Sequence, residues 1–303
     1  MSKALAPSVT ARDSKGLKFV SVVEAAYNKT GLTEEEAQRV NDTPGLPDVI
    51  RDFIDNSRSP NKYKNEEARS RYGYLSGYKG PGAITDQIDI LRKHWPTLNP
   101  DAALRYYREV YSTLAHPGWV EGAFALIRPG FFSDKYGEEV GEVLEAIKKD
   151  RGGKFHNYRE GQLNEQHLRQ LASTLAATRA LVERQPNSDI LIVGANFGIR
   201  YPQGDGTHIV SSVRRAREKV TAGEFGLGAK DGSTMLLTNP IRLQHFDDLW
   251  IDLPGDEFAP GADGVFYRAL FLGFSDDGAW LGADDVDVVS RLCASVYGFL
   301  PQQ

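Results

Sequence analysis

The chain of 303 residues has a net charge of −5 and 41% hydrophobic residues, which together indicate a folded globular protein with a substantial core. The acidic balance gives no basic field for nucleic acid, and the single cysteine, Cys293, excludes an intrachain disulfide and a multi-thiolate zinc site. No run approaches the ~18 apolar residues of a membrane span. The N-terminus has no apolar segment of the kind found in secretion signals, so we expect a protein that is cytoplasmic by default, or associated with a virus or mobile element.

The first half of the chain is patterned as amphipathic helices with clear start and stop signals. Thr33 and Glu36 have the spacing of a capping box, in which each side chain satisfies a free backbone donor of the other residue. Apolar residues recur at helical spacing from residue 84 to residue 95, and Pro96 ends that pattern. Two further helices are predicted over "GEEVGEVLEAIKKD" (137–150) and "LNEQHLRQLASTLAATRALVERQ" (163–185).

After Gln185 the pattern changes to short apolar runs bounded by glycine and proline. Three short strands are predicted in "SDILIVGANFG" (188–198), "STMLLTNP" (233–240) and "DDLWIDLPGDEF" (247–258). The sequence therefore predicts an α+β protein: a mainly helical region over residues 1–184, then a mixed domain of short strands and long loops over residues 185–303.

Two motifs invite a nucleotide or phosphate interpretation. "GANFGIRYPQGDG" (194–206) follows an apolar strand, but its glycines do not have the G-x-G-x-x-G spacing, so a structural loop is favoured. The basic run "RRAREK" (214–219) is short and is typical of the solvated face of a helix. We therefore predict no nucleic-acid partner.

Two polar clusters could carry chemistry. His245, Asp248, Asp252 and Glu257 combine an imidazole with carboxylates and could hold a divalent ion, which makes a metal-dependent hydrolase the alternative function. His156 and Glu160 could be a base and the group that orients it, although polar residues before a helix are usually structural. Neither pattern specifies an enzyme, so we expect a non-catalytic protein without a cofactor or catalytic metal.

The C-terminal segment has an unusual composition. Residues 258–301 are 44 residues without one Lys, Glu, Gln or Met, whereas residues 1–257 contain 42 of these four types, so about seven would be expected. With Trp, these are the amino acids that a codon ending in C or T cannot encode. Randomising the first two bases of AAC or AAT codons reaches the other fifteen types, which indicates adenine-directed mutagenesis. Trp280 is the exception and must be a fixed position.

This end of the chain resembles the variable proteins of diversity-generating retroelements, which carry a C-type-lectin fold at the C-terminus. Their diversified region closes on Gly-Phe and an apolar residue, here Gly298-Phe299-Leu300, and "DDLWIDLPGDEF" occupies the place of their aromatic-acidic core segment. Their Gly-Gly-Ser-Trp-like turn has only a distant counterpart in "SDDGAW" (275–280). The resemblance covers residues 185–303 and implies a hypervariable surface for protein–protein interaction, with a protein or cell-surface ligand as partner.

A diversified surface requires outward-facing variable side chains on a fixed apolar frame. The predicted frame consists of Phe271, Phe274, Trp280, Leu281 and Phe299, with Gly278, Gly282 and Gly298 at turns and close backbone approaches. The predicted ligand-binding set is Gly273, Ser275, Asp276, Asp277, Asp284, Asp285, Asp287, Val288, Val289, Arg291, Leu292 and Cys293.

Overall fold

The computed structural model describes residues 12–43, 46–47, 50–51, 54, 63–261, 263–275 and 278–301. The chain divides into two compact units, residues 1–62 and 63–303. The second unit holds the sheets and the hydrophobic core, so it carries the candidate sites discussed below.

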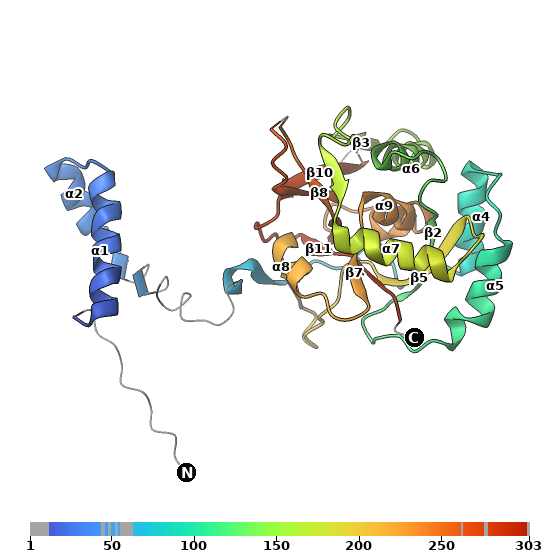
Figure 1. Ribbon diagram of the computed structural model, residues 1–303, viewed down its shortest axis with the longest axis horizontal. Helices are drawn as coiled ribbons and strands as arrows, with labels where there is room; N and C mark the ends of the chain where they lie inside the picture. The colour runs from blue at the N-terminus through green and yellow to red at the C-terminus, as the bar shows by residue number, and fades with distance from the viewer. Residues whose placement is uncertain are drawn as a thin grey trace, which may run out of the picture. The chain divides into compact units, whose positions relative to one another are not determined.

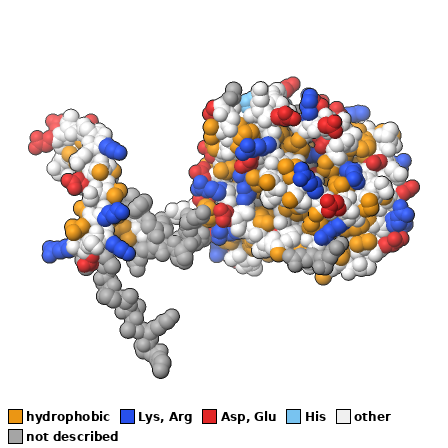
Figure 2. Space-filling model, viewed as in Figure 1, with side chains coloured by type: hydrophobic (Ala, Val, Ile, Leu, Met, Phe, Trp, Pro, Cys, Tyr) orange, Lys and Arg blue, Asp and Glu red, His pale blue; other side chains and the backbone are white. Residues whose placement is uncertain are grey.

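The first unit contains two helices, α1 (Ser14–Lys29) and α2 (Glu34–Asn41). The capping box predicted at the start of α2 is confirmed: the Glu36 backbone N–H donates to Thr33 Oγ1 at 3.3 Å, and the Thr33 N–H donates to Glu36 Oε2 at 2.9 Å. Both helices leave apolar side chains exposed, and on α1 these lie among basic side chains (Figure 2).

Within its described residues, the second unit contains three sheets. The four-stranded sheet is antiparallel, in the order β2 (Gly122–Ile127), β5 (Ile190–Asn196), β12 (Tyr297–Phe299) and β7 (Glu224–Gly226). The six-stranded sheet has the order β11 (Cys293–Ser295), β8 (Trp250–Phe258), β9 (Arg268–Ser275), β10 (Gly278–Asp285) and β3 (Phe155–Asn157), and β4 (Leu168–Gln170) also pairs with β8. A small third sheet pairs β1 (Glu67–Ser70) with β6 (His208–Ser211).

Helices cover and separate these sheets. The α-helices of the unit are α4 (Ile84–His94), α5 (Asp101–Glu109), α6 (Tyr136–Asp150), α7 (Ala172–Arg184), α8 (Val213–Glu218) and α9 (Ala229–Thr238). Short 3-10 turns occupy Lys64–Glu66, Tyr111–Thr113 and Pro240–Arg242. Figure 1 shows α9 at the centre of the unit, with β8 and β10 on one side and β2 on the other.

Every residue of α9 is buried, and this explains a wrong prediction. The segment 233–240 was expected to be a strand, but an apolar run that is buried on all sides shows no helical periodicity. The start of the helix is buried as well. The Asp256 carboxylate accepts hydrogen bonds from the Ala229 N–H at 2.6 Å and from the Tyr136 hydroxyl. The Lys230 ammonium pairs with Glu139 at 2.9 Å, so this buried charge is compensated.

The mixed α+β class is confirmed, but the predicted domain boundary at residue 184 is wrong. Strands β2, β3 and β4 all precede it, and they pair with β5, β10 and β8, which follow it. For the same reason the helix predicted over 163–185 begins only at Ala172, because Leu168–Gln170 pairs with β8. Pairing between segments distant in the chain leaves little local signal in the sequence.

Candidate ligand-binding surface

The antiparallel strands β9 and β10 have two chemically different faces. Leu270, Leu272 and Leu281 point to one face and are fully buried in the core. The opposite face carries Phe271 beside Gly282 and Gly273 beside Trp280 in the pairing register. We call this second face, together with Trp250 of β8 and His156 of β3, the aromatic face.

The rings of the aromatic face form one contact cluster. Trp250 and Phe271 are stacked, with ring centroids 5.8 Å apart and planes 7° apart. The Trp280 ring meets both edge-on, at 5.1 Å from Trp250 and 4.9 Å from Phe271. Tyr158 extends the cluster 5.4 Å beyond Trp280, and its side chain is 57% exposed. Aromatic groups at a surface offer large contact areas with few rotatable bonds, a combination that suits ligand binding.

Two glycines create the room in which Trp280 lies. A Cβ on Gly282 would come within 2.5 Å of Trp280 Cζ3, and one on Gly273 within 2.9 Å of Trp280 Cε2. The prediction that Gly282 serves a close approach is therefore confirmed. Gly273 is buried and cannot vary freely, contrary to its place in the predicted variable set.

The predicted frame residues divide between the core and this face. Leu281 lies in the core, and Phe274 and Phe299 are partly buried. Phe271 is buried, at 9% exposure, as predicted, and Trp280 is partly buried. Both lie on the aromatic face, on the side of the sheet opposite the core leucines, because they alternate with those leucines along β9 and β10. That alternation of Leu with aromatic residues or Gly was the sequence signal for an outward aromatic surface.

The loop between β10 and β11, residues 286–292, is anchored through its backbone. Val286 O accepts from the Arg214 N–H at 2.7 Å, Arg291 O accepts from the Ser70 hydroxyl at 2.6 Å, and Leu292 O accepts from the Trp250 N–H at 2.6 Å. These bonds use carbonyl oxygens of the loop, so they do not depend on which side chains the loop carries.

The predicted ligand-binding residues fall into four groups by exposure. Exposed are Asp284, Asp287, Val288 and Arg291; partly buried are Ser275, Asp285, Val289 and Leu292; buried are Gly273 and Cys293; and Asp276 and Asp277 lie outside the described residues. Cys293 was expected to face outward, but it lies inside β11 beside β8 and is only 7% exposed. Burial raises the pKa of its thiol, which keeps it protonated and disfavours a role as nucleophile.

Burial also affects an acidic residue on the same side of the sheet as the aromatic face. The Asp252 carboxyl lies on β8 opposite Phe271 and is 9% exposed. Burial, and then the nearby Asp284 charge, raise the pKa of Asp252 to about 7. Its protonation therefore changes near neutral pH.

The cluster proposed for a divalent ion is not assembled. Asp248 precedes β8 and accepts from the Ser76 hydroxyl at 2.6 Å and from backbone N–H groups, including that of His245. Glu257 pairs with Arg169 at 2.7 Å. Across the described part of the chain, no group of three or more His, Cys, Asp or Glu side chains could hold a metal ion.

The remaining polar motifs have structural surroundings. His156 stacks on Tyr158 at the edge of the aromatic face, while Glu160 is exposed on the turn that follows. Strand β5 is followed by a loop and β6 with no helix between them, so "GANFGIRYPQGDG" has the structural geometry that was favoured. The basic run lies mostly on α8, where Arg214 pairs with Glu66.

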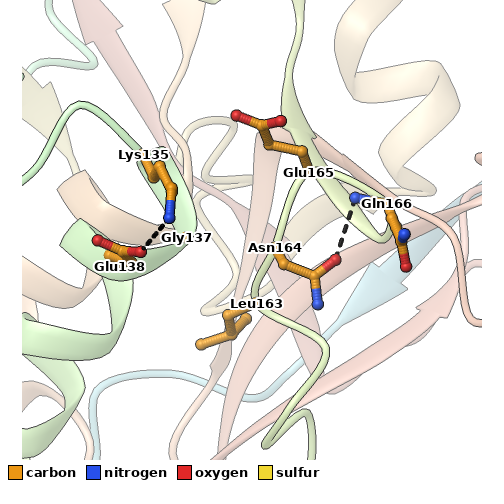
Figure 3. A pocket seen from close by; sticks show the side chains of 7 residues that line it. All are labelled: Lys135, Gly137, Glu138, Leu163, Asn164, Glu165 and Gln166. Carbon is orange, nitrogen blue, oxygen red and sulfur yellow. Dashed lines mark hydrogen bonds and ion pairs between the residues drawn. The ribbon is translucent and has the colours of Figure 1, made fainter.

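A surface pocket of about 400 Å³ lies between the start of α6 and residues 163–166 (Figure 3). Several of its polar groups already bind one another: Lys135 pairs with Glu138 at 2.9 Å, and Asn164 Oδ1 accepts from the Gln166 N–H at 3.0 Å. The aromatic face and the 286–292 loop are therefore the stronger candidate surface.

Comparison with protein-family models, with curated proteins and with solved structures finds no match to this chain. None of the helices in the described residues is long and apolar enough to cross a membrane.

Proposed function

We propose that this protein is a non-catalytic binding protein whose C-terminal segment presents a diversified ligand-binding surface. In this surface the residues of the aromatic face are constant, and the variable part consists of the side chains of Asp284, Asp287, Val288 and Arg291. The partner is a protein or cell-surface ligand. The proposal includes a C-type-lectin-like arrangement of the strands that carry this surface, of the kind that diversity-generating retroelements modify.

The observation that carries this proposal is the backbone anchoring of the 286–292 loop. Three of its carbonyl oxygens accept hydrogen bonds from other segments, while Asp287, Val288 and Arg291 remain exposed. A loop held in this way keeps its conformation when its exposed side chains change. The codon restriction of residues 258–301 supports the same interpretation. Its one exception, Trp280, packs closely against Gly273 and Gly282, as expected of a fixed position.

The aromatic face supports a binding role over a catalytic one. Its side chains are mainly rings, which supply contact area and stacking but little acid–base chemistry. The exposed valine of the 286–292 loop, Val288 at 48% exposure, adds apolar surface that a bound partner would remove from water.

The first test is genomic. Sequencing the DNA that flanks the gene should find a reverse transcriptase gene and a near-copy of the 3′ end that differs almost only at adenines. If neither is present, the diversification proposal fails.

The second test compares substitution tolerance within the segment. Asp287, Val288 and Arg291 are randomised together with codons ending in C or T, and the fraction of protease-resistant variants is counted. We expect most variants to remain folded, with free energies of unfolding within about 0.5 kcal/mol of the parent protein. Randomising Leu270, Leu272 and Leu281 in the same way is the matched control, and it should abolish folding in most variants. Equal losses in both libraries would contradict the proposal.

A further inference from the structure

Several buried side-chain nitrogens near a different sheet lack hydrogen-bond acceptors in the described part of the chain. The site lies where β5 ends against β12 in the four-stranded sheet, and it is independent of the aromatic face. Asn196 is fully buried at this point, and its Oδ1 accepts from the Tyr297 N–H at 3.0 Å. Its Nδ2 has no hydrogen-bond partner within the part of the chain that the structure describes. Exchanging Oδ1 and Nδ2 of Asn196 would not remove the unpaired group, because the Tyr297 N–H requires an oxygen as its acceptor.

Arg200 supplies the second set of free donors. Its side chain is 6% exposed and pairs with Glu224 through Nη2 alone. Nε and Nη1 have no partner among the described residues. The Tyr297 hydroxyl lies beside the guanidinium, but neither free nitrogen meets it in hydrogen-bonding geometry.

Aromatic rings surround this guanidinium without satisfying it. Its Cζ atom lies 4.6 Å from the Tyr297 ring centroid, 4.9 Å from that of Trp119 and 5.0 Å from that of Tyr201. Ring contacts engage the flat faces of a guanidinium, whereas its N–H bonds point outward in the plane. The free donors therefore still need an acceptor.

His116 adds a third polar group to the same region. Neither of its ring nitrogens has a hydrogen-bond partner among the described residues. The ring lies 4.4 Å from that of Tyr111 and 6.2 Å from that of Phe299, and a Cβ on Gly194 would be 3.2 Å from His116 Nδ1. Gly194 is two residues before Asn196 on β5, so the histidine lies over the same end of the sheet. His116 and Trp119 are both partly exposed, so this wall of the site reaches the surface.

We propose that Arg200, Asn196 and His116 form a binding site for an organic carboxylate with an aromatic or apolar body. The unpartnered groups of Arg200 and Asn196 are all donors, so the missing group is an acceptor, and a carboxylate accepts several N–H bonds at once. The rings of Tyr297 and Phe299 both pack against Trp119 beside these donors and would contact the apolar body of the ligand. The carboxylate comes from a free small molecule or from the C-terminus of a peptide.

The test uses two probes that differ only in the carboxylate: N-acetyl-L-phenylalanine and N-acetyl-L-phenylalaninamide. Calorimetric titration of the full chain at fixed ionic strength should detect the acid, with the amide binding at least about tenfold more weakly. A hexapeptide that ends in phenylalanine distinguishes the two sources, since tighter binding of the peptide identifies a chain terminus and tighter binding of the single amino acid identifies a small molecule. Equal affinity for acid and amide, or no binding of any probe, overturns the proposal.

Two variants locate the binding. Arg200→Lys keeps a positive charge opposite Glu224 but lacks the Nε and Nη1 donors. It should bind N-acetyl-L-phenylalanine at least about tenfold more weakly than the parent protein. Arg215→Lys is the matched control, because the Arg215 Nε already donates to Glu67 at 2.8 Å. The affinity of this variant for the acid should remain within about twofold of that of the parent protein.

If Arg200→Lys does not fold, Asn196→Asp provides the same test. It retains an oxygen for the Tyr297 N–H and replaces the free donor with an acceptor that repels a carboxylate, so binding should be lost. Undiminished binding in a folded variant of either kind overturns the proposal. So does a crystal structure grown with the acid that shows only ordered water against Arg200 and Asn196.

Discussion

Replacing Gly273 with alanine places a methyl group where the Trp280 ring lies. The new Cβ would be 2.9 Å from Trp280 Cε2 and Cζ2 and 3.2 Å from Trp250 Cδ2. Because Trp280 also packs against Phe271, the ring cannot move aside without loss of contact. Overpacking of this kind costs about 1–3 kcal/mol, and the lower entropy of the unfolded alanine chain offsets up to about 1 kcal/mol of it. We expect Gly273→Ala to lower the free energy of unfolding by about 1–2 kcal/mol.

Urea unfolding followed by tryptophan fluorescence measures this change, and near-ultraviolet circular dichroism reports whether the tryptophan rings have moved. Gly118→Ala is the matched control, since no atom lies within 4 Å of the added Cβ. It should change the free energy of unfolding by no more than about 0.5–1 kcal/mol, in the stabilising direction. Combining Gly273→Ala with Trp280→Leu should remove most of the added cost. If Gly273→Ala is as stable as the parent protein and leaves the dichroism unchanged, the aromatic face is not tightly packed and Gly273 can belong to the variable set.

Three further predictions concern the fold. Because burial raises the pKa of Asp252 from 3.8 to about 7, the folded protein holds a proton that the unfolded chain releases. The contribution of this proton to the free energy of unfolding is complete below about pH 4 and falls by up to about 1.4 kcal/mol per pH unit as the pH rises toward 7. Asp252→Asn should flatten that decline. If the urea midpoint of the variant depends on pH as that of the parent protein does, the assignment is contradicted. Lys230→Met leaves the Glu139 carboxylate buried without its cation and should cost about 3–5 kcal/mol, of which Lys230→Met/Glu139→Leu should recover a large part in the same unfolding assay. The chain shortened to residues 63–303 should unfold cooperatively with the midpoint of the full chain, because it contains the whole main core; a lowered midpoint would show that the first unit stabilises the second.

Local patterns were sufficient for several elements. The capping box at Thr33, the helix at Ile84–His94 and the strand at Ile190–Asn196 were predicted from neighbouring residues, and the structure has all three. In each case the signal was local: a cap, a helical stripe or a short apolar run before a glycine. The sequence was insufficient for α9, which is buried on all sides, and for β4, whose partner residues on β8 lie about ninety positions further along the chain.

The candidate surface was predicted in part. Composition alone singled out the segment 258–301, and Asp284, Asp287, Val288 and Arg291 are exposed there as expected. Phe271 is buried and Trp280 partly buried, in line with their hydrophobicity, but hydrophobicity alone does not show that both lie on the side of the sheet opposite the core leucines. The donors at Asn196 and Arg200 lie close together at the end of β5, but His116 comes from a distant segment, so no local motif could have joined all three.

The sequence by itself determined the mixed class, the local helix and strand signals and the restricted alphabet of the C-terminal segment, since these depend on residue type and spacing along the chain. Only the tertiary structure decided which side of β9 and β10 faces inward, which carbonyl groups hold the 286–292 loop, and where buried donors lack acceptors. The physical reason is that burial and hydrogen bonding depend on partners from distant segments, and those partners meet only when the sheets form.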